Sequence, residues 1–291
     1  MTENSALTYL SLFDPVAPVP SGYNTNKSLA IWSVGGRREL DASVLSDLTR
    51  QFGTEVFQVL ADGDTPTDCS TKRLDKAVER SKRWANRFWT YLDLSQEAKQ
   101  PFGTVIGGYS NQHRLASASD CASYDYCGFQ LSALPFSEDR LNCCQDSKMA
   151  DALSGIWEVL PRDKVRLLSG SFSPSQVVWL TQLGLDLFDS SFAYLSTQQG
   201  RAFQLGCRFP DSPDDVTTID LNHKRYAEDF TAPFESCQCY TCTNYTKSYL
   251  CHLLNTSELL ANILLMIHNT EEYERVFTKI RDSVRLKQSG K

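Results

Sequence analysis

Residues 165–189 read VRLLSGSFSPSQVVWLTQLGLDLFD, and this stretch decides the class of fold. Two short apolar runs, at 165–170 and 185–189, flank a segment with helical spacing at 174–183. Ser173 and Pro174 stand in the order N-cap then N1, where the serine supplies a hydrogen-bond acceptor and the proline a preset φ. A strand, a helix and a second strand in this order predict a βαβ unit with parallel strands.

The same alternation extends upstream to residue 28. Further apolar or β-branched runs predict strands at 28–34, 56–61, 103–108 and 128–134. The segments between them predict helices at about 41–52, 71–92, 111–122 and 146–159. Six strands joined by helices indicate an α/β fold. The pattern leaves open whether they form an open doubly wound sheet or part of an eight-stranded (β/α)8 barrel.

Composition narrows the class of protein. The 291 residues carry 35 acidic and 29 basic side chains, so the net charge of -6 argues against a surface that binds phosphates everywhere. The longest nearly apolar run, 259–267, is too short to cross a bilayer, and Glu3 stands where a signal peptide would be positively charged. We therefore expect an intracellular protein without a transmembrane segment. Its ten cysteines are then thiols, and clustered ones are candidate metal ligands.

The pattern changes after residue 190. Two segments, 201–209 (RAFQLGCRF) and 216–222 (VTTIDLN), indicate irregular or antiparallel pieces, and a long helix is expected at about 257–287. This change predicts two parts: a partial (β/α) barrel over residues 1–205, and a zinc-binding subdomain with C-terminal helices over residues 206–291.

A cysteine cluster lies in the second part. Cys237, Cys239 and Cys242 form a C-x-C-x-x-C, and His268 follows in the long helix. Three thiolates and one imidazole match the Cys3His ligand set of a tetrahedral structural zinc. Such a site has no open position, so it would hold the loop against the helix rather than activate water. His252 and Cys251, which are nearer in sequence, are the alternative ligands.

Several motifs resemble those of the tRNA-guanine transglycosylases. The cysteine cluster, residues 248–254 (SYLCHLL), Glu258-Leu259-Leu260 and Met266-Ile267-His268-Asn269 are similar to that family's C-terminal zinc subdomain in order and spacing. Upstream, residues 184–189 (GLDLFD) resemble the segment that bears the family's nucleophilic aspartate. The resemblance covers most of the chain from about residue 50. It implies a (β/α)8 barrel and one structural zinc per subunit, with His268 as the fourth ligand.

The resemblance also assigns roles to carboxylates. In this family an aspartate attacks the ribose C1′ of tRNA, guanine leaves and a deazaguanine enters. Asp189 aligns with the nucleophile, Asp62 with a base-recognition aspartate, and Glu138 survives from the strip that lines the base pocket. Other pocket features differ, since Gly63 and Asp64 replace a Glu-Cys pair. The Ser-Gly-Gly-Phe-Gln loop that accompanies the family's acid/base aspartate does not occur in the sequence.

A degenerate pocket beside an intact zinc subdomain is typical of the family's accessory type of subunit. The resemblance then implies a non-catalytic partner of a catalytic queuine tRNA-ribosyltransferase subunit. Such a heterodimer exchanges guanine for queuine at the wobble position of tRNAs whose anticodon begins with guanine. The resemblance also implies a cytoplasmic location, with peripheral association at the mitochondrial outer membrane. The six-strand count further predicts a barrel that is incomplete at its N-terminus.

Two alternatives stay open from the sequence. The chain is an active transglycosylase that uses Asp189, or it is a zinc-dependent tRNA-binding module. The second alternative would use basic side chains on two predicted helices to contact phosphates. These side chains are Lys82, Arg83 and Arg87 on the first helix, and Lys279, Arg281, Arg285 and Lys287 on the last.

Overall fold

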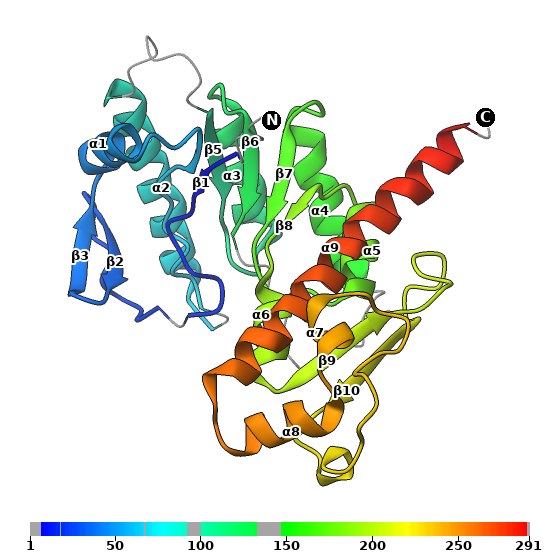
Figure 1. The fold of residues 1–291 in the computed structure, drawn as a ribbon. Helices are drawn as coiled ribbons and strands as arrows, with labels where there is room; N and C mark the ends of the chain where they lie inside the picture. Colours follow the sequence, from blue (N-terminus) through cyan, green and yellow to red (C-terminus); the bar gives the residue numbers. More distant parts are fainter. Residues whose placement is uncertain (1–6, 18, 67, 92–99, 133–146, 290–291) are drawn as a thin grey trace. The chain divides into compact units, whose positions relative to one another are not determined.

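The computed structural model describes residues 7–17, 19–66, 68–91, 100–132 and 147–289, which form two compact units (Figure 1). The first unit contains the residues up to Ser169 together with Leu183–Phe188. The second contains Gly170–Gln182 and the chain from Asp189 onward. The boundary between residues 205 and 206 follows the change in sequence pattern and stays a prediction.

A curled parallel sheet forms the first unit. Its strands follow the order β1-β4-β5-β6-β7-β8, and every neighbouring pair is parallel. They are β1 (Tyr9–Leu10), β4 (Val56–Gln58), β5 (Gln100–Val105), β6 (Gly128–Leu131), β7 (Val165–Leu168) and β8 (Leu187–Phe188). Strands β4 and β6 are buried along their whole length, and each carries one buried glutamine, Gln58 and Gln130, among its apolar residues.

The strand order decides between the two α/β alternatives. Successive strands are added on the same side of the sheet, so right-handed crossovers place all the connecting helices on one face. Consecutive helices accordingly pack on one another, α1 on α2, α2 on α3 and α3 on α4. These helices are α1 (Ala42–Phe52), α2 (Thr71–Tyr91), α3 (Asn111–Ala122) and α4 (Ser147–Val159). The α/β fold of the barrel type is confirmed, as half of a barrel.

One predicted strand lies outside this sheet. Residues 28–34 contain β2 (Leu29–Ser33), which pairs antiparallel with β3 (Gly36–Leu40), so the prediction of a parallel strand there is wrong. The two-residue connection Val34-Gly35 reverses the chain, and Gly36 follows at a φ of 92°. A tight turn of this kind favours a hairpin over a crossover. The first strand of the parallel sheet is β1, whose two residues are too few to produce a pattern.

The second unit contains an antiparallel pair and six helices among its described residues. As predicted, β9 (Arg201–Leu205) and β10 (Val216–Asp220) are antiparallel. The helices are α5 (Pro174–Gln182), α6 (Ser191–Gln198), a short 3-10 helix (Lys224–Tyr226), α7 (Tyr240–Asn244), α8 (Lys247–Asn255) and α9 (Leu259–Ser289). Ser257, at a left-handed φ of 56°, ends α8, because the N–H of Glu258 then bonds back to the carbonyl oxygen of Leu253 at 2.9 Å, and α9 begins at Leu259.

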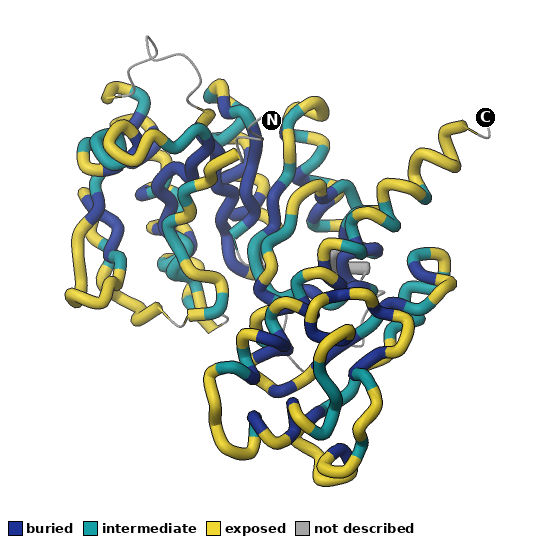
Figure 2. The backbone as a smooth tube through the Cα atoms, viewed as in Figure 1, coloured by how far each residue is buried: buried dark blue, intermediate teal, exposed yellow. Residues whose placement is uncertain are grey.

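Each unit has its own core (Figure 2). Phe57, Trp84 and Phe88 are fully buried in the first unit. In the second, leucines of α8 and α9 pack around the cysteine cluster. No helix in the described part of the chain is both long and apolar enough to cross a membrane.

Candidate metal centre and substrate pocket

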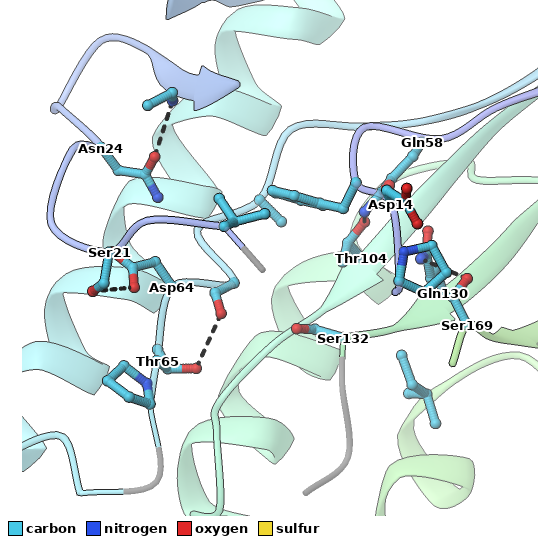
Figure 3. Close-up of a pocket in the computed structure, with 18 of the residues that line it drawn as sticks. Asp14, Ser21, Asn24, Gln58, Asp64, Thr65, Thr104, Gln130, Ser132 and Ser169 are labelled. Carbon is cyan, nitrogen blue, oxygen red and sulfur yellow. Dashed lines mark hydrogen bonds between the residues drawn. The ribbon is translucent and has the colours of Figure 1, made fainter. Parts of the chain in front are cut away.

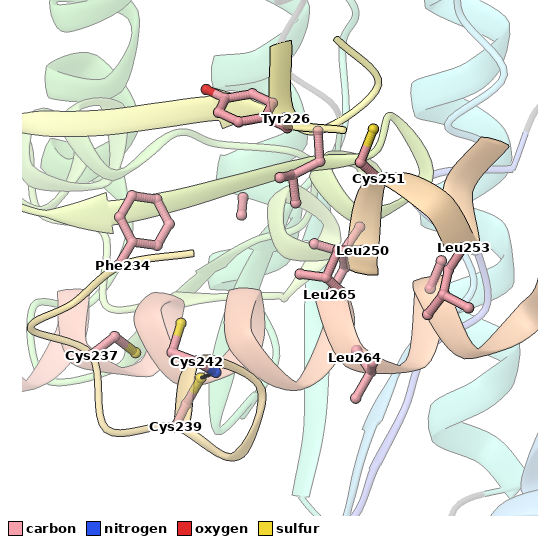
Figure 4. Close-up of a cluster of buried hydrophobic side chains, with 13 residues drawn as sticks. Tyr226, Phe234, Cys237, Cys239, Cys242, Leu250, Cys251, Leu253, Leu264 and Leu265 are labelled. Carbon is pink, nitrogen blue, oxygen red and sulfur yellow. Dashed lines mark hydrogen bonds between the residues drawn. The ribbon is translucent and has the colours of Figure 1, made fainter. Parts of the chain in front are cut away.

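Four predicted ligands converge in the second unit, and Figure 4 shows the three cysteines among them. Cys239 is the N-cap of α7, Cys242 lies within that helix, and His268 lies in α9. All four residues are buried, and their ligand atoms lie within 4.8 Å of one another. The histidine Nδ1 is 3.6 Å from the Sγ of Cys237 and 3.4 Å from the Sγ of both Cys239 and Cys242.

These distances fit a tetrahedral metal. Zinc bonds of about 2.3 Å to sulfur and about 2.0 Å to nitrogen place the two ligand atoms about 3.5 Å apart in a tetrahedron. The other ring nitrogen of His268, Nε2, is 2.9 Å from the carbonyl oxygen of Phe203 on β9. When Nε2 donates to that oxygen, Nδ1 keeps its lone pair for a metal. The ring of Phe234 stacks on the imidazole with centroids 5.2 Å apart and fixes its plane.

Electrostatics at the cluster also favour a cation. Burial lowers the pKa of His268, but hydrogen bonds with the three cysteine sulfurs outweigh burial and raise that pKa to about 12. Burial raises the pKa of Cys239, and the contact with His268 reverses the shift and lowers it to about 7, whereas burial outweighs the same contact at Cys242 and leaves the pKa of that thiol raised. Thiolates buried in this way require positive charge at the centre of the group, and a divalent cation would supply it. The four residues could hold a metal ion.

The alternative ligands lie elsewhere. His252 is exposed on α8. Cys251 is buried, but its Sγ is 3.8 Å from the carbonyl oxygen of His223 and accepts a hydrogen bond from Asn255 at 3.5 Å. Neither belongs to the group of converging ligand atoms.

A pocket lies in the first unit, near the carboxyl ends of β4 to β7 (Figure 3). Its volume is about 400 Å³. The polar side chains that line it bond mainly to one another. Gln58 donates to Thr104 at 3.3 Å, and Gln130 donates to Ser169 at 3.2 Å. The carboxyl ends of parallel strands are where barrel enzymes place their active sites, so this is the position expected for a substrate.

Asp62 is held entirely by protein groups. Its carboxylate is fully buried and accepts two hydrogen bonds from Arg73, at 2.8 and 3.0 Å. It accepts two more, from Arg80 at 2.9 Å and from the Asn24 side chain at 2.8 Å. A carboxylate offers about four lone-pair sites, so these bonds use its capacity. Asp62 has no acceptor left for a purine base.

The sequence did not reveal the partners of Asp62. Arg73, Arg80 and Asn24 are 11, 18 and 38 residues away in the chain, and no short motif connects them. The one available signal is their place in the predicted elements. Arg73 and Arg80 are two turns apart on α2, so both can reach the same point beside that helix.

Asp189 belongs to the second unit, where it precedes Ser190, the N-cap of α6, and its carboxylate accepts two backbone hydrogen bonds. One carboxylate oxygen accepts a hydrogen bond from the backbone N–H of Ser191 in the first turn of α6, at 2.8 Å. The other accepts from the backbone N–H of Gly170, also at 2.8 Å. Asp189 therefore has a structural role at the start of α6. Glu138, the third carboxylate that the resemblance assigns, lies outside the described residues.

Comparison with known proteins identifies the family. The family model described as queuine tRNA-ribosyltransferase matches residues 7–289. The chain belongs to the queuine tRNA-ribosyltransferase family. Three relatives named "Queuine tRNA-ribosyltransferase accessory subunit 2" come from Caenorhabditis elegans, Gallus gallus and Homo sapiens. They are 40%, 35% and 32% identical to the chain. The matches cover 96%, 95% and 96% of the chain, and 74%, 72% and 75% of the relatives.

Within the queuine tRNA-ribosyltransferase family, this chain combines two features. The four residues predicted to bind metal are buried together with suitable distances. The carboxylate aligned with base recognition is bonded to two arginines and an asparagine.

The two basic clusters are largely paired inside the protein. Lys82 bonds Asp120 at 2.6 Å, and Arg83 bonds Glu79 at 2.9 Å. The Nζ of Lys279 lies 3.4 Å from the carbonyl oxygen of Phe209. These contacts favour the reading of both helix faces as ordinary solvated surfaces.

Proposed function

We propose that the chain is a non-catalytic accessory subunit of a queuine tRNA-ribosyltransferase heterodimer. In this role it supports exchange of guanine for queuine at the wobble position of tRNAs whose anticodon begins with guanine. The observation that carries the proposal is the complete bonding of Asp62 by Arg73, Arg80 and Asn24, which removes it from base recognition. The names of the relatives agree with this role.

The proposed metal is one structural zinc, held by Cys237, Cys239, Cys242 and His268. The support is the donor set and the distances of 3.4 to 3.6 Å between Nδ1 and the sulfurs. Bound zinc would supply a cross-link between the segment before α7 and helix α9. With four protein ligands it would have no position for water.

The proposed contact surface for the catalytic homologue lies on the second unit. Leu259, Ile263 and Ile267 are exposed at intervals of four residues on α9, so they form one apolar stripe. Tyr245 stacks on Tyr249 at 5.5 Å near this region of the sequence, and Tyr249 is exposed. Exposed apolar and aromatic side chains in groups are typical of protein interfaces.

The cytoplasm is the proposed location, with peripheral association at the mitochondrial outer membrane. This proposal rests on the family resemblance. Fractionation of cells that express a tagged chain would test it, with protease protection of intact mitochondria to distinguish the outer surface from the interior.

Co-expression with the catalytic homologue tests the proposed role. We expect the two chains to purify together, about one zinc in this chain, and labelled queuine to enter tRNA only when the homologue is present. Incorporation by this chain alone would show an active transglycosylase instead. Failure to form a complex while zinc stays bound would contradict the accessory role.

A further inference from the structure

The hairpin of β2 and β3 is an exposed arm on the first unit (Figure 1). Its base is anchored, since Leu29 and Leu40 are buried and Asn24 accepts a hydrogen bond from the N–H of Ala30 at 3.0 Å. Beyond that base, residues 32–39 are all exposed (Figure 2). The arm is therefore held firmly at one end while its tip is open to a partner.

Aromatic and cationic side chains meet on one face of the arm. Trp32 and Arg37 are directly opposite in the register, so their side chains share a face. Tyr23 joins them, with its ring 5.3 Å from that of Trp32 and 5.4 Å from the guanidinium carbon of Arg37. Tyr23 is 45% exposed and Trp32 is 42% exposed. Two large rings thus remain half open to solvent.

The charge of the arm is opposite to that of the chain. Residues 23–40 contain Lys27, Arg37, Arg38 and a single acid, Glu39, whereas the whole chain carries a net charge of -6. The contact between Arg37 and Glu39 is long, at 3.8 Å, and both side chains are exposed. Arg38 forms no ion pair within the described part of the protein. The cations of the arm are therefore available to an anion.

We propose that this arm binds single-stranded RNA. Exposed rings give bases a stacking surface, and the neighbouring cations bind the phosphates, which is the usual combination for single strands. The occupant is an RNA rather than an acidic protein because the arm offers ring faces and cations together and few apolar side chains. The inference rests on the proposed function, since that function brings the chain to the unpaired bases of a tRNA loop.

Binding of a fluorescent oligouridylate of about 12 nucleotides to the full chain tests the proposal. We expect Trp32→Ala to weaken binding by roughly 5-fold to 100-fold, the usual range for loss of one stacking contact. Arg37→Ala should reduce the slope of log K against log salt by about 0.7, the contribution of one single-strand phosphate contact. Heparin is a polyanion without bases, and Trp32→Ala should leave its affinity unchanged.

Two matched variants serve as controls. Tyr91→Ala removes another exposed ring, and Arg281→Ala with Arg285→Ala removes two arginines from α9. Both should bind the oligouridylate as the parent chain does. The proposal is overturned if the hairpin variants bind RNA normally, or if only the α9 variant loses affinity.

The outcomes separate this proposal from the proposed function. If the parent chain binds oligouridylate through the arm but does not purify with the catalytic homologue, the accessory role fails and the RNA-binding arm stands. If the hairpin variants retain RNA binding and instead lose the homologue, the arm is a protein contact and the inference is overturned.

Discussion

The carboxylate of Asp62 is fully buried between two arginines, of which Arg80 is nearly buried and Arg73 is 24% exposed. Burial lowers the pKa of Arg73, but its hydrogen bonds and ion pairs with Asp62 and Asp64 outweigh burial and raise it, so the arginine stays charged. Removal of the carboxylate would leave two cations facing each other. At the scale of single residues, Asp62 therefore acts in folding.

The first prediction concerns this carboxylate. Asp62→Ala should lower the free energy of unfolding by about 3–5 kcal/mol, because loss of one partner leaves uncompensated buried charge. Urea denaturation measures the change. Asp125→Ala is the matched control, since its side chain is 91% exposed and bonds Lys164 at 3.2 Å. The control should lose less than about 1 kcal/mol. Equal losses in the two variants would contradict a structural role for Asp62.

The second prediction concerns Asp189. Its hydrogen bonds with the backbone N–H groups of Ser191 and Gly170 imply that Asp189→Ala lowers the free energy of unfolding by about 1–3 kcal/mol. Queuine incorporation by the complex with the catalytic homologue should persist under conditions in which the variant remains folded. Asp189→Asn keeps one acceptor oxygen but turns an NH2 donor toward the other backbone N–H, so it should recover only part of the stability. Loss of incorporation in this folded Asn variant would instead identify Asp189 as a nucleophile.

At the scale of secondary-structure elements, the cysteine cluster joins α7, α9 and β9. Cys239 caps α7 and Cys242 lies within it, His268 lies in α9, and the Nε2 of that histidine contacts β9 through the carbonyl oxygen of Phe203. A metal at this point would add to the contact that α7 already makes with α9, where the hydroxyl of the buried Thr241 donates to the carbonyl oxygen of Leu264 at 2.6 Å. Helix α7 has only five residues, fewer than an isolated helix needs to be stable.

The third prediction is loss of metal. Cys242→Ser should reduce bound zinc by at least about 10-fold and lower the hydrogen-exchange protection of α7 and β9, because a structural zinc contributes directly to folding. Plasma mass spectrometry and exchange measurements give the two results. Cys251→Ala is the control, because that thiol is buried nearby but does not join the cluster. Zinc loss in both variants would contradict the ligand assignment.

The sequence correctly predicts those helices and strands that have strong local signals. Helices α1 and α3 begin within one residue of their predicted starts, and Asp41 caps the first by accepting from the N–H of Val44 at 2.9 Å. The strand at 28–34 was assigned the wrong partner because an apolar run does not specify its neighbour. Only the turn at Val34-Gly35, together with the polar sequence of β3, distinguishes a hairpin from a crossover.

The metal group and the pocket around Asp62 also differ in how much of each the sequence predicts. Three cysteines within six residues predict a metal-binding group from the sequence alone. His268, in the predicted C-terminal helix, supplies the fourth ligand. The fate of Asp62 depends on side chains from an upstream loop and from α2, which meet only after folding. Local spacing predicts the first arrangement and carries no information on the second.

At the scale of the whole molecule, the proposed role depends on assembly, and the fourth prediction tests the stripe on α9. Ile263→Glu should reduce co-purification with the catalytic homologue at least about 10-fold, because a charge in a desolvated apolar contact is strongly unfavourable. Val284→Glu is the control on the same helix, with 45% exposure against 47% for Ile263. Normal assembly of the Ile263 variant would place the homologue on another surface.

The bonding of Asp62 limits how this pocket can change by mutation. Loss of Arg73 leaves Arg80 and Asn24 on the carboxylate, and loss of Arg80 leaves Arg73 bonded to both oxygens. No single substitution among these three partners frees both carboxylate oxygens, because Arg73 bonds both of them while Arg80 and Asn24 bond one each. A form of this pocket in which both oxygens of Asp62 are free to bind a base is therefore more than one substitution away from the present sequence.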